Sequence, residues 1–359
     1  MTEPDFTDAL VLTGGGTGGH FFPAIALAEG ARRRWPDRPI RFIGARRGIE
    51  AGKLAGSPWQ HLLLDVEGFH GRSPLRVLRS LWKLWRATRQ VKRLYRAWRP
   101  WAVVGTGGYA AAPALLAARS LGIPYFLHES NAAPGSLVKL LSARATRVWC
   151  GMEAARALLP GARCRTVGTP VRDAFLRPFK PISELAPPLR LLVMGGSGGA
   201  RSINEAMARI SAELLEVHPD WEILHQTGKV DPAWLASLDL PPRHGITPFI
   251  DGVDRAMEEA SLVLCRAGAA TCAELRACGR PAVLVPLPTS AGDHQRLNVR
   301  AMAAEGRAVL LEQGEGFELR LASVLNGLMA SERDRQALSR PEWNTAVESC
   351  LEDLASLPG

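Results

Sequence analysis

The sequence predicts an α/β protein of two doubly wound, Rossmann-like domains whose parallel sheets face a cleft. The first observation is a recurring unit in which a short apolar strand leads through a glycine-rich turn into an amphipathic helix, the pattern of parallel sheets covered on both faces. The second is an internal repeat: GGTGGH at residues 15–20 aligns with GGSGGA at residues 195–200, an offset of 195 − 15 = 180 residues. Because this offset is about half of the 359-residue chain, each half opens with the same unit.

The predicted elements repeat this unit along the chain. Five strands are predicted, at Leu10–Thr13, Ala102–Val104, Leu189–Met194, Ser261–Cys265 and Ala282–Val285. The first three lead into helices at Pro23–Arg34, Pro113–Ser120 and Ser202–Leu215, and the last two into the segments RAGAATCAELRACG and PLPTSAGDHQRLN. Ligands of such sheets bind at the carboxyl ends of the strands, where these turns lie.

The boundary between the two domains is predicted near residue 175. The segment Arg177–Arg190 contains four prolines just before the second copy of the repeat, which is typical of a linker. We therefore expect one domain over residues 1–175 and a second over residues 176–339.

Composition excludes several classes of protein. A hydrophobic content of 47% excludes a disordered chain, a collagen-like fibre and a small disulfide scaffold. The six cysteines form no C-x-x-C pair, so we expect buried free thiols in a reducing cytosol. The acidic start (Glu3, Asp5, Asp8) argues against a signal peptide, and the charge-free stretch Pro100–Ala118, interrupted by prolines and glycines, against a transmembrane helix.

The glycine-rich turns predict phosphate binding. A glycine run between a strand and a helix lets backbone N–H groups converge on an anion at the positive end of the helix dipole. No turn matches the G-x-x-x-x-G-K-[ST] pattern of a P-loop. Gly14–Gly19 does match G-x-G-x-x-G, but the acidic residue that would hold a nicotinamide ribose about 20 residues later is not well placed, so a dehydrogenase is a minor alternative.

His20 is the first candidate for a catalytic group. It ends the first copy of the repeat, where the second copy has Ala200. The dipole at a helix N-terminus disfavours the imidazolium form, and a neutral imidazole can act as a general base. The sequence alone leaves equally open a histidine that only caps or packs the helix.

The positive net charge of 44 − 35 = +9 is concentrated in one segment, residues 72–99, which we call the basic strip. The strip contains ten Lys or Arg residues and no acidic residue, so the rest of the chain sums to 9 − 10 = −1. We expect a helix whose core face is the stripe Val77, Leu84, Val91 and Trp98, with Tyr95 beside it.

A second apolar cluster in the strip points away from this stripe and predicts a membrane-binding patch. Tryptophan and leucine enter the headgroup boundary while arginines meet anionic lipid. The patch comprises Leu78, Leu81, Trp82, Trp85, Arg89 and Arg93. Two alternatives remain open: a helix buried on more than one side with a solvated basic end, and a nucleic-acid-binding strip, which also combines basic and aromatic residues.

Taken together, the motifs resemble one family. GGTGGHFFPAIALAE, EGFHGR, GTGGYAAAP, HESNAAPG, GTPVR, MGGSGGARSIN, FIDGVDRAMEEASLVLCRAGAATCAEL and DHQRLN occur in that order over roughly residues 8–310. They look like the MurG family of peptidoglycan enzymes, which add N-acetylglucosamine to the undecaprenyl-linked muramyl-pentapeptide. Two departures are Gly198 and Ser130, where the family usually has glutamine.

The resemblance implies a GT-B glycosyltransferase that converts lipid I to lipid II with inversion at the sugar. The donor would be UDP-N-acetylglucosamine, and the enzyme would lie peripherally on the cytoplasmic face of the inner membrane. The acceptor would be bound by the N-terminal domain, with a final helix within 340–359 packed on it, and the nucleotide by the C-terminal domain. Other cell-wall synthesis proteins are implied as partners, and nucleic acid is not. Alternatives within the fold are a diacylglycerol glycosyltransferase and a UDP-N-acetylglucosamine epimerase.

The resemblance also assigns roles to individual residues. His20 would be the base. In the nucleotide site, Ile250 would contact uracil, Glu274 would bind both ribose hydroxyls, and Ser197 with Arg172 would hold the diphosphate. The remaining donor contacts would be Thr17, Gly18, Gly19, Asn131, Ala269, Ala270 and Gln295. The chain contains no Asp-x-Asp pair, so we expect no obligate metal and no cofactor.

Overall fold

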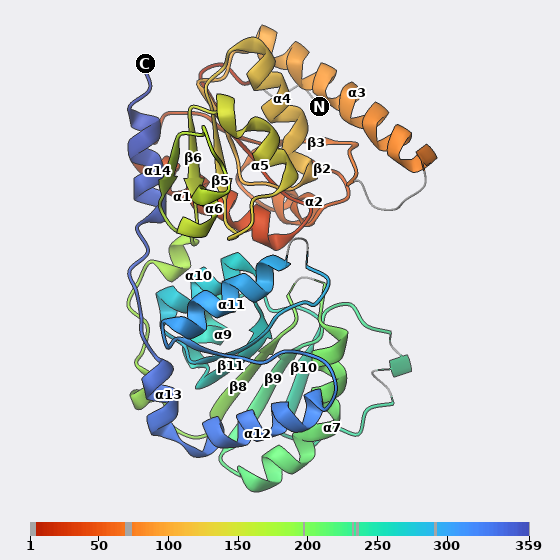
Figure 1. Ribbon diagram of the computed structural model, residues 1–359, viewed down its shortest axis with the longest axis vertical. Coiled ribbons are helices and arrows are strands. Elements are labelled where there is room, and N and C mark those ends of the chain that lie inside the picture. The colour runs from red at the N-terminus through yellow and green to blue at the C-terminus, as the bar shows by residue number, and fades with distance from the viewer. Residues whose placement is uncertain are drawn as a thin grey trace. The chain divides into compact units, whose positions relative to one another are not determined.

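The computed structural model describes residues 5–68, 74–196, 198–231, 233–234, 237–290 and 293–358. The chain divides into two compact units (Figure 1). Unit 1 runs to Asp173 and resumes at Asn344, whereas unit 2 is Ala174–Trp343. Each unit contains one parallel sheet with helices on both faces, so the predicted fold class is confirmed. No helix in the described ranges is long and apolar enough to cross a membrane.

The sheet of unit 1 has the strand order β3-β2-β1-β4-β5-β6-β7, and every described pair is parallel. Its strands are β1 (Leu10–Thr13), β2 (Ile40–Ala45), β3 (Gln60–Leu64), β4 (Ala102–Gly105), β5 (Tyr125–Glu129), β6 (Arg147–Cys150) and β7 (Cys164–Thr166). Its helices are α1 (Gly18–Arg34), α2 (Ile49–Ala55), α3 (Pro74–Ala97), α4 (Ala112–Leu121), α5 (Ser136–Leu141), α6 (Glu153–Ala157) and α14 (Ala346–Ala355).

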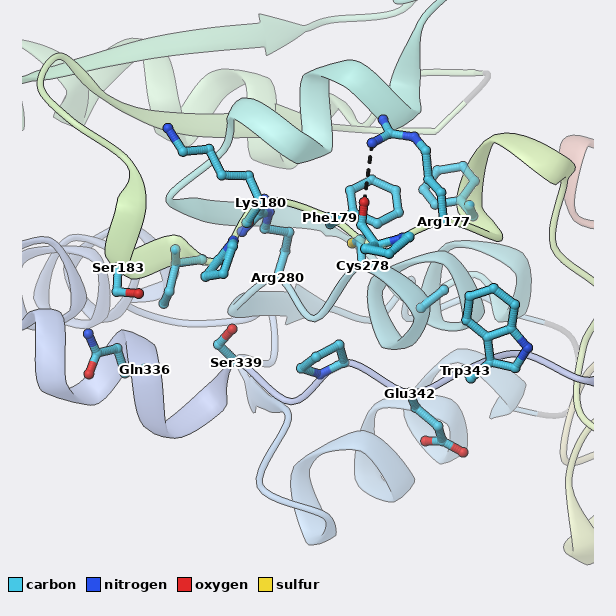
Figure 2. A pocket seen from close by; sticks show the side chains of 16 residues that line it. Arg177, Phe179, Lys180, Ser183, Cys278, Arg280, Gln336, Ser339, Glu342 and Trp343 are labelled. Carbon is cyan, nitrogen blue, oxygen red and sulfur yellow. Dashed lines mark hydrogen bonds between the residues drawn. The ribbon is translucent and has the colours of Figure 1, made fainter.

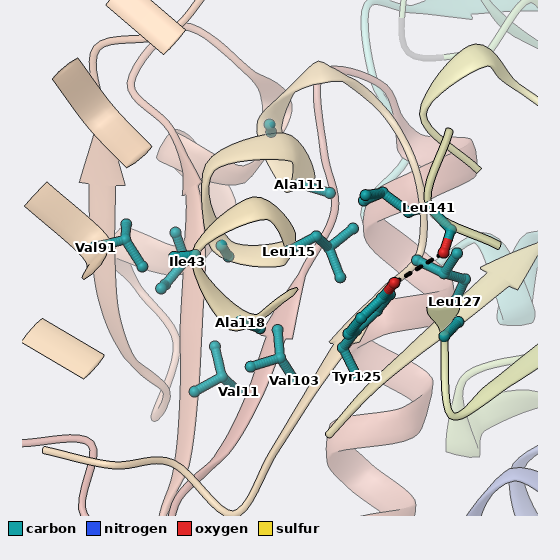
Figure 3. Close-up of a cluster of buried hydrophobic side chains, with 14 of the residues drawn as sticks. Val11, Ile43, Val91, Val103, Ala111, Leu115, Ala118, Tyr125, Leu127 and Leu141 are labelled. Carbon is teal, nitrogen blue, oxygen red and sulfur yellow. Dashed lines mark hydrogen bonds between the residues drawn. The ribbon is translucent and has the colours of Figure 1, made fainter. Parts of the chain in front are cut away.

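Alternate residues of the unit 1 strands point to opposite faces and build two cores. Val11, Ile43 and Val103 pack with α3 and α4 on one face, as Figure 3 shows around Leu115. Leu12 and its neighbours on the other face pack with α1 and α14. The last helix therefore lies in unit 1, where Asp353 accepts a 2.7 Å hydrogen bond from the Trp149 indole.

The sheet of unit 2 has the order β10-β9-β8-β11-β12-β13, again entirely parallel. Its strands are β8 (Leu189–Met194), β9 (Trp221–Gln226), β10 (His244–Thr247), β11 (Leu262–Arg266), β12 (Ala282–Val285) and β13 (Ala308–Leu310). Its helices are α7 (Arg201–Val217), α9 (Val253–Glu259), α10 (Ala269–Cys278), α11 (His294–Ala304), α12 (Phe317–Ala330) and α13 (Glu332–Leu338). Because β8 begins at Leu189, the last two residues of the predicted linker belong to a strand.

Both copies of the internal repeat consist of a strand, a glycine turn and a helix, but the two turns differ in length. Gly16 and Gly196 occupy equivalent places and both adopt a left-handed φ, of +84° and +83°. However, α1 begins at Gly18, whereas α7 begins only at Arg201. The aligned pair therefore joins unlike positions: His20 lies in the first turn of α1, and Ala200 is the residue that caps α7.

The predicted core face of the basic strip is confirmed in part. The buried residues of α3 are Ser80, Lys83, Ala87, Val91, Leu94 and Tyr95. Of the predicted stripe Val91 is buried, Val77 and Leu84 are half-buried and Trp98 is 39% exposed, and Tyr95 beside the stripe is buried. The stripe did not include Lys83, which a hydropathy pattern places outward but which is buried on this face. Its ammonium lies inside, 3.1 Å from an Asp65 oxygen and 3.0 Å from a Glu67 oxygen, so this charge of the strip is neutralised within the fold.

Candidate active site

Two loops meet at His20, at the carboxyl edge of the unit 1 sheet. The turn after β1 carries His20 into the first turn of α1, and the loop after the adjacent β4 lies against its ring. A Cβ atom built on Gly107 would fall 2.6 Å from His20 Nδ1, so this loop approaches as closely as it does only with glycine. The Thr106 hydroxyl also donates a 2.6 Å hydrogen bond to the His20 carbonyl. The backbone and the ring of His20 are therefore both held by the β4 loop.

The hydrogen bond of the ring determines its tautomer. His20 Nδ1 lies 3.1 Å from the carbonyl oxygen of Thr106, which can only accept. Nδ1 is therefore the protonated nitrogen, and in the neutral ring Nε2 carries the lone pair. The half-buried imidazole thus has the protonation pattern of a general base.

Thr17, Gly18 and Gly19 form the start of α1 beside His20. Thr17 is the N-cap residue and its side chain makes no capping hydrogen bond. Thr17 is exposed and the two glycines are half-buried, so this helix start is accessible at the sheet edge, as a substrate-lining role requires.

Asn131 lies on the loop after β5 in the same unit. Glu129 orders this loop by accepting hydrogen bonds from the Asn131 backbone N–H (2.9 Å), its side-chain amide (3.1 Å) and the Gly135 N–H (2.8 Å). Ser130, one of the two departures from the family motif, donates to Nδ1 of the buried His128 (3.2 Å), whose Nε2–H donates to the Gly168 carbonyl (3.0 Å). Burial lowers the pKa of His128 to about 4, so the ring is neutral at pH 7.

Arg172 also belongs to unit 1, not to the unit with the second glycine turn. Its guanidinium lies 4.5 Å from the centre of the Phe22 ring on α1. Burial raises the pKa of the nearby Glu29, and the positive charge of Arg172 opposes that shift. The contacts described for Arg172 thus tie it to α1, and its predicted role at the diphosphate stays a prediction.

In unit 2, the second glycine turn packs on the loop after β9. Ser197 lies outside the described residues, but the glycines around it are described. A Cβ on Gly199 would collide with the carbonyl of Thr227, and Gln226 donates a 2.9 Å hydrogen bond to the Gly196 carbonyl. The turn is therefore held by residues 226–228.

The other predicted nucleotide residues gather at the same carboxyl edge of the unit 2 sheet. Ala269 and Ala270 begin α10 directly after β11, and the buried Glu274 lies one turn further along that helix. Ile250 follows β10, and Gln295 lies in the first turn of α11, where its Oε1 accepts a 2.9 Å hydrogen bond from the Leu287 N–H. Because all strands are parallel, these residues share one edge.

Sequence reasoning missed several residues that shape these two edges. Glu50, Thr106 and Gln226 hold the glycine turns, and Arg266 donates to the Ser202 hydroxyl at the start of α7 (3.1 Å). The sequence did contain a signal for Thr106, Gln226 and Arg266. Each lies at or directly after the carboxyl end of a strand, close to a glycine. The sequence contained no such signal for Glu50, because Glu50 comes next to the first glycine turn only when β1 pairs with β2.

A cavity of about 470 Å³ lies elsewhere in unit 2, between residues 175–183 and the chain after α13. Figure 2 shows Phe179, Arg280 and Trp343 among its lining residues. None of the predicted site residues lines it, so this cavity is separate from the proposed nucleotide site.

The predicted membrane patch is exposed on the outer side of α3. Leu78, Leu81, Trp82 and Trp85 are 62%, 47%, 55% and 55% exposed. Arg89 and Arg93 are exposed beside them, and the Arg89 guanidinium lies 4.7 Å from the centre of the Trp85 ring. The alternative of a helix buried on more than one side is therefore wrong. Arg72, the first charge of the strip, lies outside the described residues.

Two further predictions concern metals and thiols. Across the described ranges, no three His, Cys, Asp or Glu side chains are grouped as a metal site requires; metal-free catalysis stays a prediction. All six cysteines are free thiols, and five of them are buried, as predicted.

Comparisons with known proteins agree with this architecture. Residues 10–150 match the glycosyltransferase family 28 N-terminal domain, and residues 190–353 its C-terminal domain. The UDP-N-acetylglucosamine–N-acetylmuramyl-(pentapeptide) pyrophosphoryl-undecaprenol N-acetylglucosamine transferase of Syntrophotalea carbinolica is 40% identical over 330 residues, covering 89% of each chain.

Among solved structures, MurG of Acinetobacter baumannii is 27% identical, with a TM-score of 0.67 over 98% of this chain and 99% of that one. A structure described as a UDP-N-acetylglucosamine 2-epimerase of Listeria monocytogenes has the same TM-score of 0.67 over 98% and 96%, but only 15% identity. That second likeness shows the fold alone.

Proposed function

We infer the function from family membership. The chain belongs to the family of UDP-N-acetylglucosamine–N-acetylmuramyl-(pentapeptide) pyrophosphoryl-undecaprenol N-acetylglucosamine transferases, within glycosyltransferase family 28. It is a hexosyltransferase that moves N-acetylglucosamine from UDP-N-acetylglucosamine to lipid I and so forms lipid II. The epimerase alternative is not favoured, because that likeness is confined to the fold.

His20 acts as the general base in this proposal. The observation that carries it is the 3.1 Å hydrogen bond from Nδ1 to the Thr106 carbonyl, which leaves the lone pair on Nε2. Nε2 takes the proton of the acceptor hydroxyl as its oxygen attacks the anomeric carbon. The bond from that carbon to the diphosphate breaks on the opposite side, so the configuration inverts and UDP leaves.

Unit 2 binds the nucleotide at the carboxyl edge of its sheet. The buried Glu274 binds the ribose diol, since a carboxylate can accept from two hydroxyls. Ile250 contacts uracil, and the backbone after Ala269 and Ala270 faces the phosphates. Ser197, at the second glycine turn, and Arg172 stabilise the charge of the leaving diphosphate. Asn131 and Gln295 bind hydroxyls of the transferred sugar.

The membrane patch brings the enzyme to its lipid-linked acceptor. Four large apolar side chains are exposed together on α3, with arginines alongside. Such a surface binds anionic bilayers peripherally. The cytoplasmic face is the side on which nucleotide sugars are available, and other cell-wall synthesis proteins are proposed as partners there. Nucleic acid is the competing ligand for the same strip.

Acceptor-dependent release of UDP tests the activity. We expect UDP to appear only when UDP-N-acetylglucosamine and a lipid I analogue are both present, and not when diacylglycerol replaces the analogue. Release with diacylglycerol, or with the nucleotide sugar alone, would contradict the proposal and favour one of the other enzymes of this fold.

A further inference from the structure

Glu50 is a fully buried carboxylate that the proposed reaction leaves unexplained. It lies in the first turn of α2 with no exposed surface, and its two oxygens accept hydrogen bonds from two backbone N–H groups. Oε2 accepts from Gly16 at 2.9 Å, and Oε1 from Ala45 at 3.0 Å. Burial of a carboxylate is unfavourable unless hydrogen bonds compensate it, and these two hydrogen bonds fix the carboxylate against the first glycine turn and the end of β2.

The chain makes room for this carboxylate on several sides. Side chains at Gly15 or Gly48 would collide with the carboxyl group, and a Cβ on Gly44 would fall 2.7 Å from Glu50 Cγ. Gly15 and Gly16 belong to the first glycine turn, whereas Gly44 lies on β2 and Gly48 caps α2. The glycines of the first turn thus enclose a carboxylate of the protein itself, and the Gly16 N–H is already occupied.

The clamped turn touches the histidine. A Cβ on Gly108 would collide with the Gly15 carbonyl and lie 3.1 Å from His20 Cδ2, so these three residues are in direct contact range. From Gly16 the chain runs through Thr17 into α1, whose first turn contains His20. A shift of Gly15 or Gly16 would therefore move both the β4 loop and the start of the helix that hold the imidazole.

We infer that Glu50 is a positioning residue: its buried carboxylate clamps the first glycine turn and thereby fixes the imidazole of His20 for proton transfer. This inference rests on the proposed role of His20. It also assigns different tasks to the two copies of the repeat, since the Gly16 N–H binds Glu50 and is not a ligand for substrate phosphate.

The Glu50→Gln variant tests the inference, because glutamine keeps the shape but offers one acceptor oxygen to two N–H groups. We expect kcat for lipid I glycosylation to fall by about tenfold to a hundredfold, the effect of a small misplacement of a catalytic group. The affinity for UDP should not change, because Ile250 and Glu274, the residues proposed to bind its uracil and ribose, lie in unit 2. The matched control is Glu153→Gln, an exposed carboxylate in the first turn of another short helix of unit 1, which should be fully active.

A double variant separates positioning from a general loss of structure. If Glu50 acts through His20, Glu50→Gln should cost nothing further in a His20→Ala background, whereas independent effects would multiply. A normal kcat in folded Glu50→Gln, a weakened affinity for UDP, or a multiplied loss would each overturn the inference. If Glu50→Gln does not fold, Gly44→Ala is the second variant, because a methyl group at this position of β2 pushes on the Glu50 side chain and displaces its carboxylate. A normal kcat in Gly44→Ala would also overturn the inference. A fully active His20→Ala enzyme would instead refute the role of His20 as base. The single His20→Ala variant is assayed separately, so the two failures can be distinguished.

Discussion

At the scale of single residues, His20 carries the clearest prediction. His20→Ala should lower turnover by about two or more orders of magnitude, the usual cost of removing a general base. Calorimetric titration should still show UDP-sugar binding, because the residues proposed to bind uracil and ribose lie in the other unit. His61→Ala is the matched control, since His61 Nδ1 also pairs with a backbone carbonyl, that of Trp59, at 2.9 Å. Turnover near normal in His20→Ala would remove this histidine from the role of base.

Glu274 gives a second prediction at this scale. Glu274→Gln should weaken UDP binding by about tenfold to a hundredfold, the range for hydrogen bonds to a charged acceptor. Fluorescence or calorimetric titration should show the loss for UDP and little further loss for 2′-deoxy-UDP, which lacks one hydroxyl of the diol. The exposed Glu213 on α7 provides a control through Glu213→Gln. Equal weakening for both nucleotides would place Glu274 away from the ribose.

At the scale of elements, α3 carries the membrane prediction. Trp82→Ala and Trp85→Ala should each weaken binding to phosphatidylglycerol vesicles by about tenfold or more, given the transfer free energy of a large apolar side chain. Vesicle flotation measures the effect. Trp343→Ala serves as the control, because Trp343 is 63% exposed but lies in unit 2. Unchanged flotation, or retention of oligonucleotides in its place, would show that the basic strip has another ligand.

The same helix shows what can be read from a sequence. Hydrophobic periodicity correctly predicted a long helix with an exposed apolar cluster, and apolar runs predicted the five strands to within a residue. The buried face of α3 was predicted only in part, because Lys83 also lies on it with its ammonium paired to Asp65 and Glu67. Glu50 was missed for a related reason, since its partner Gly16 is reached only through the pairing of β2 with β1. Periodicity reports which side chains avoid water, not which charges find partners inside.

At the scale of the whole molecule, buried histidines predict sensitivity to acid. Burial lowers the pKa of His128 and His244 to about 4 and that of His225 to about 3. Between pH 6.5 and 4 the unfolded chain binds protons that the folded chain excludes, so the free energy of unfolding falls as the pH falls through this window. For His128 alone, the change from pH 7.5 to 5 amounts to about 2 kcal/mol.

Calorimetric unfolding at the two pH values tests this prediction. His128→Gln should be less stable than the parent at pH 7.5, because the bonds to Gly168 and Ser130 change. Its further loss at pH 5 should nevertheless be smaller by about 2 kcal/mol, since glutamine does not titrate. The same loss in both proteins would mean that His128 is not the titrating group.

We propose that this two-unit α/β protein glycosylates lipid I from UDP-N-acetylglucosamine with His20 as base. The most direct measurement is product analysis by mass spectrometry after incubation with UDP-N-acetylglucosamine and a lipid I analogue in anionic vesicles. One N-acetylglucosamine should be added to the analogue for each UDP released, and His20→Ala should form little product. Epimerised nucleotide sugar, or UDP formed without a lipid-linked disaccharide, would contradict the proposal.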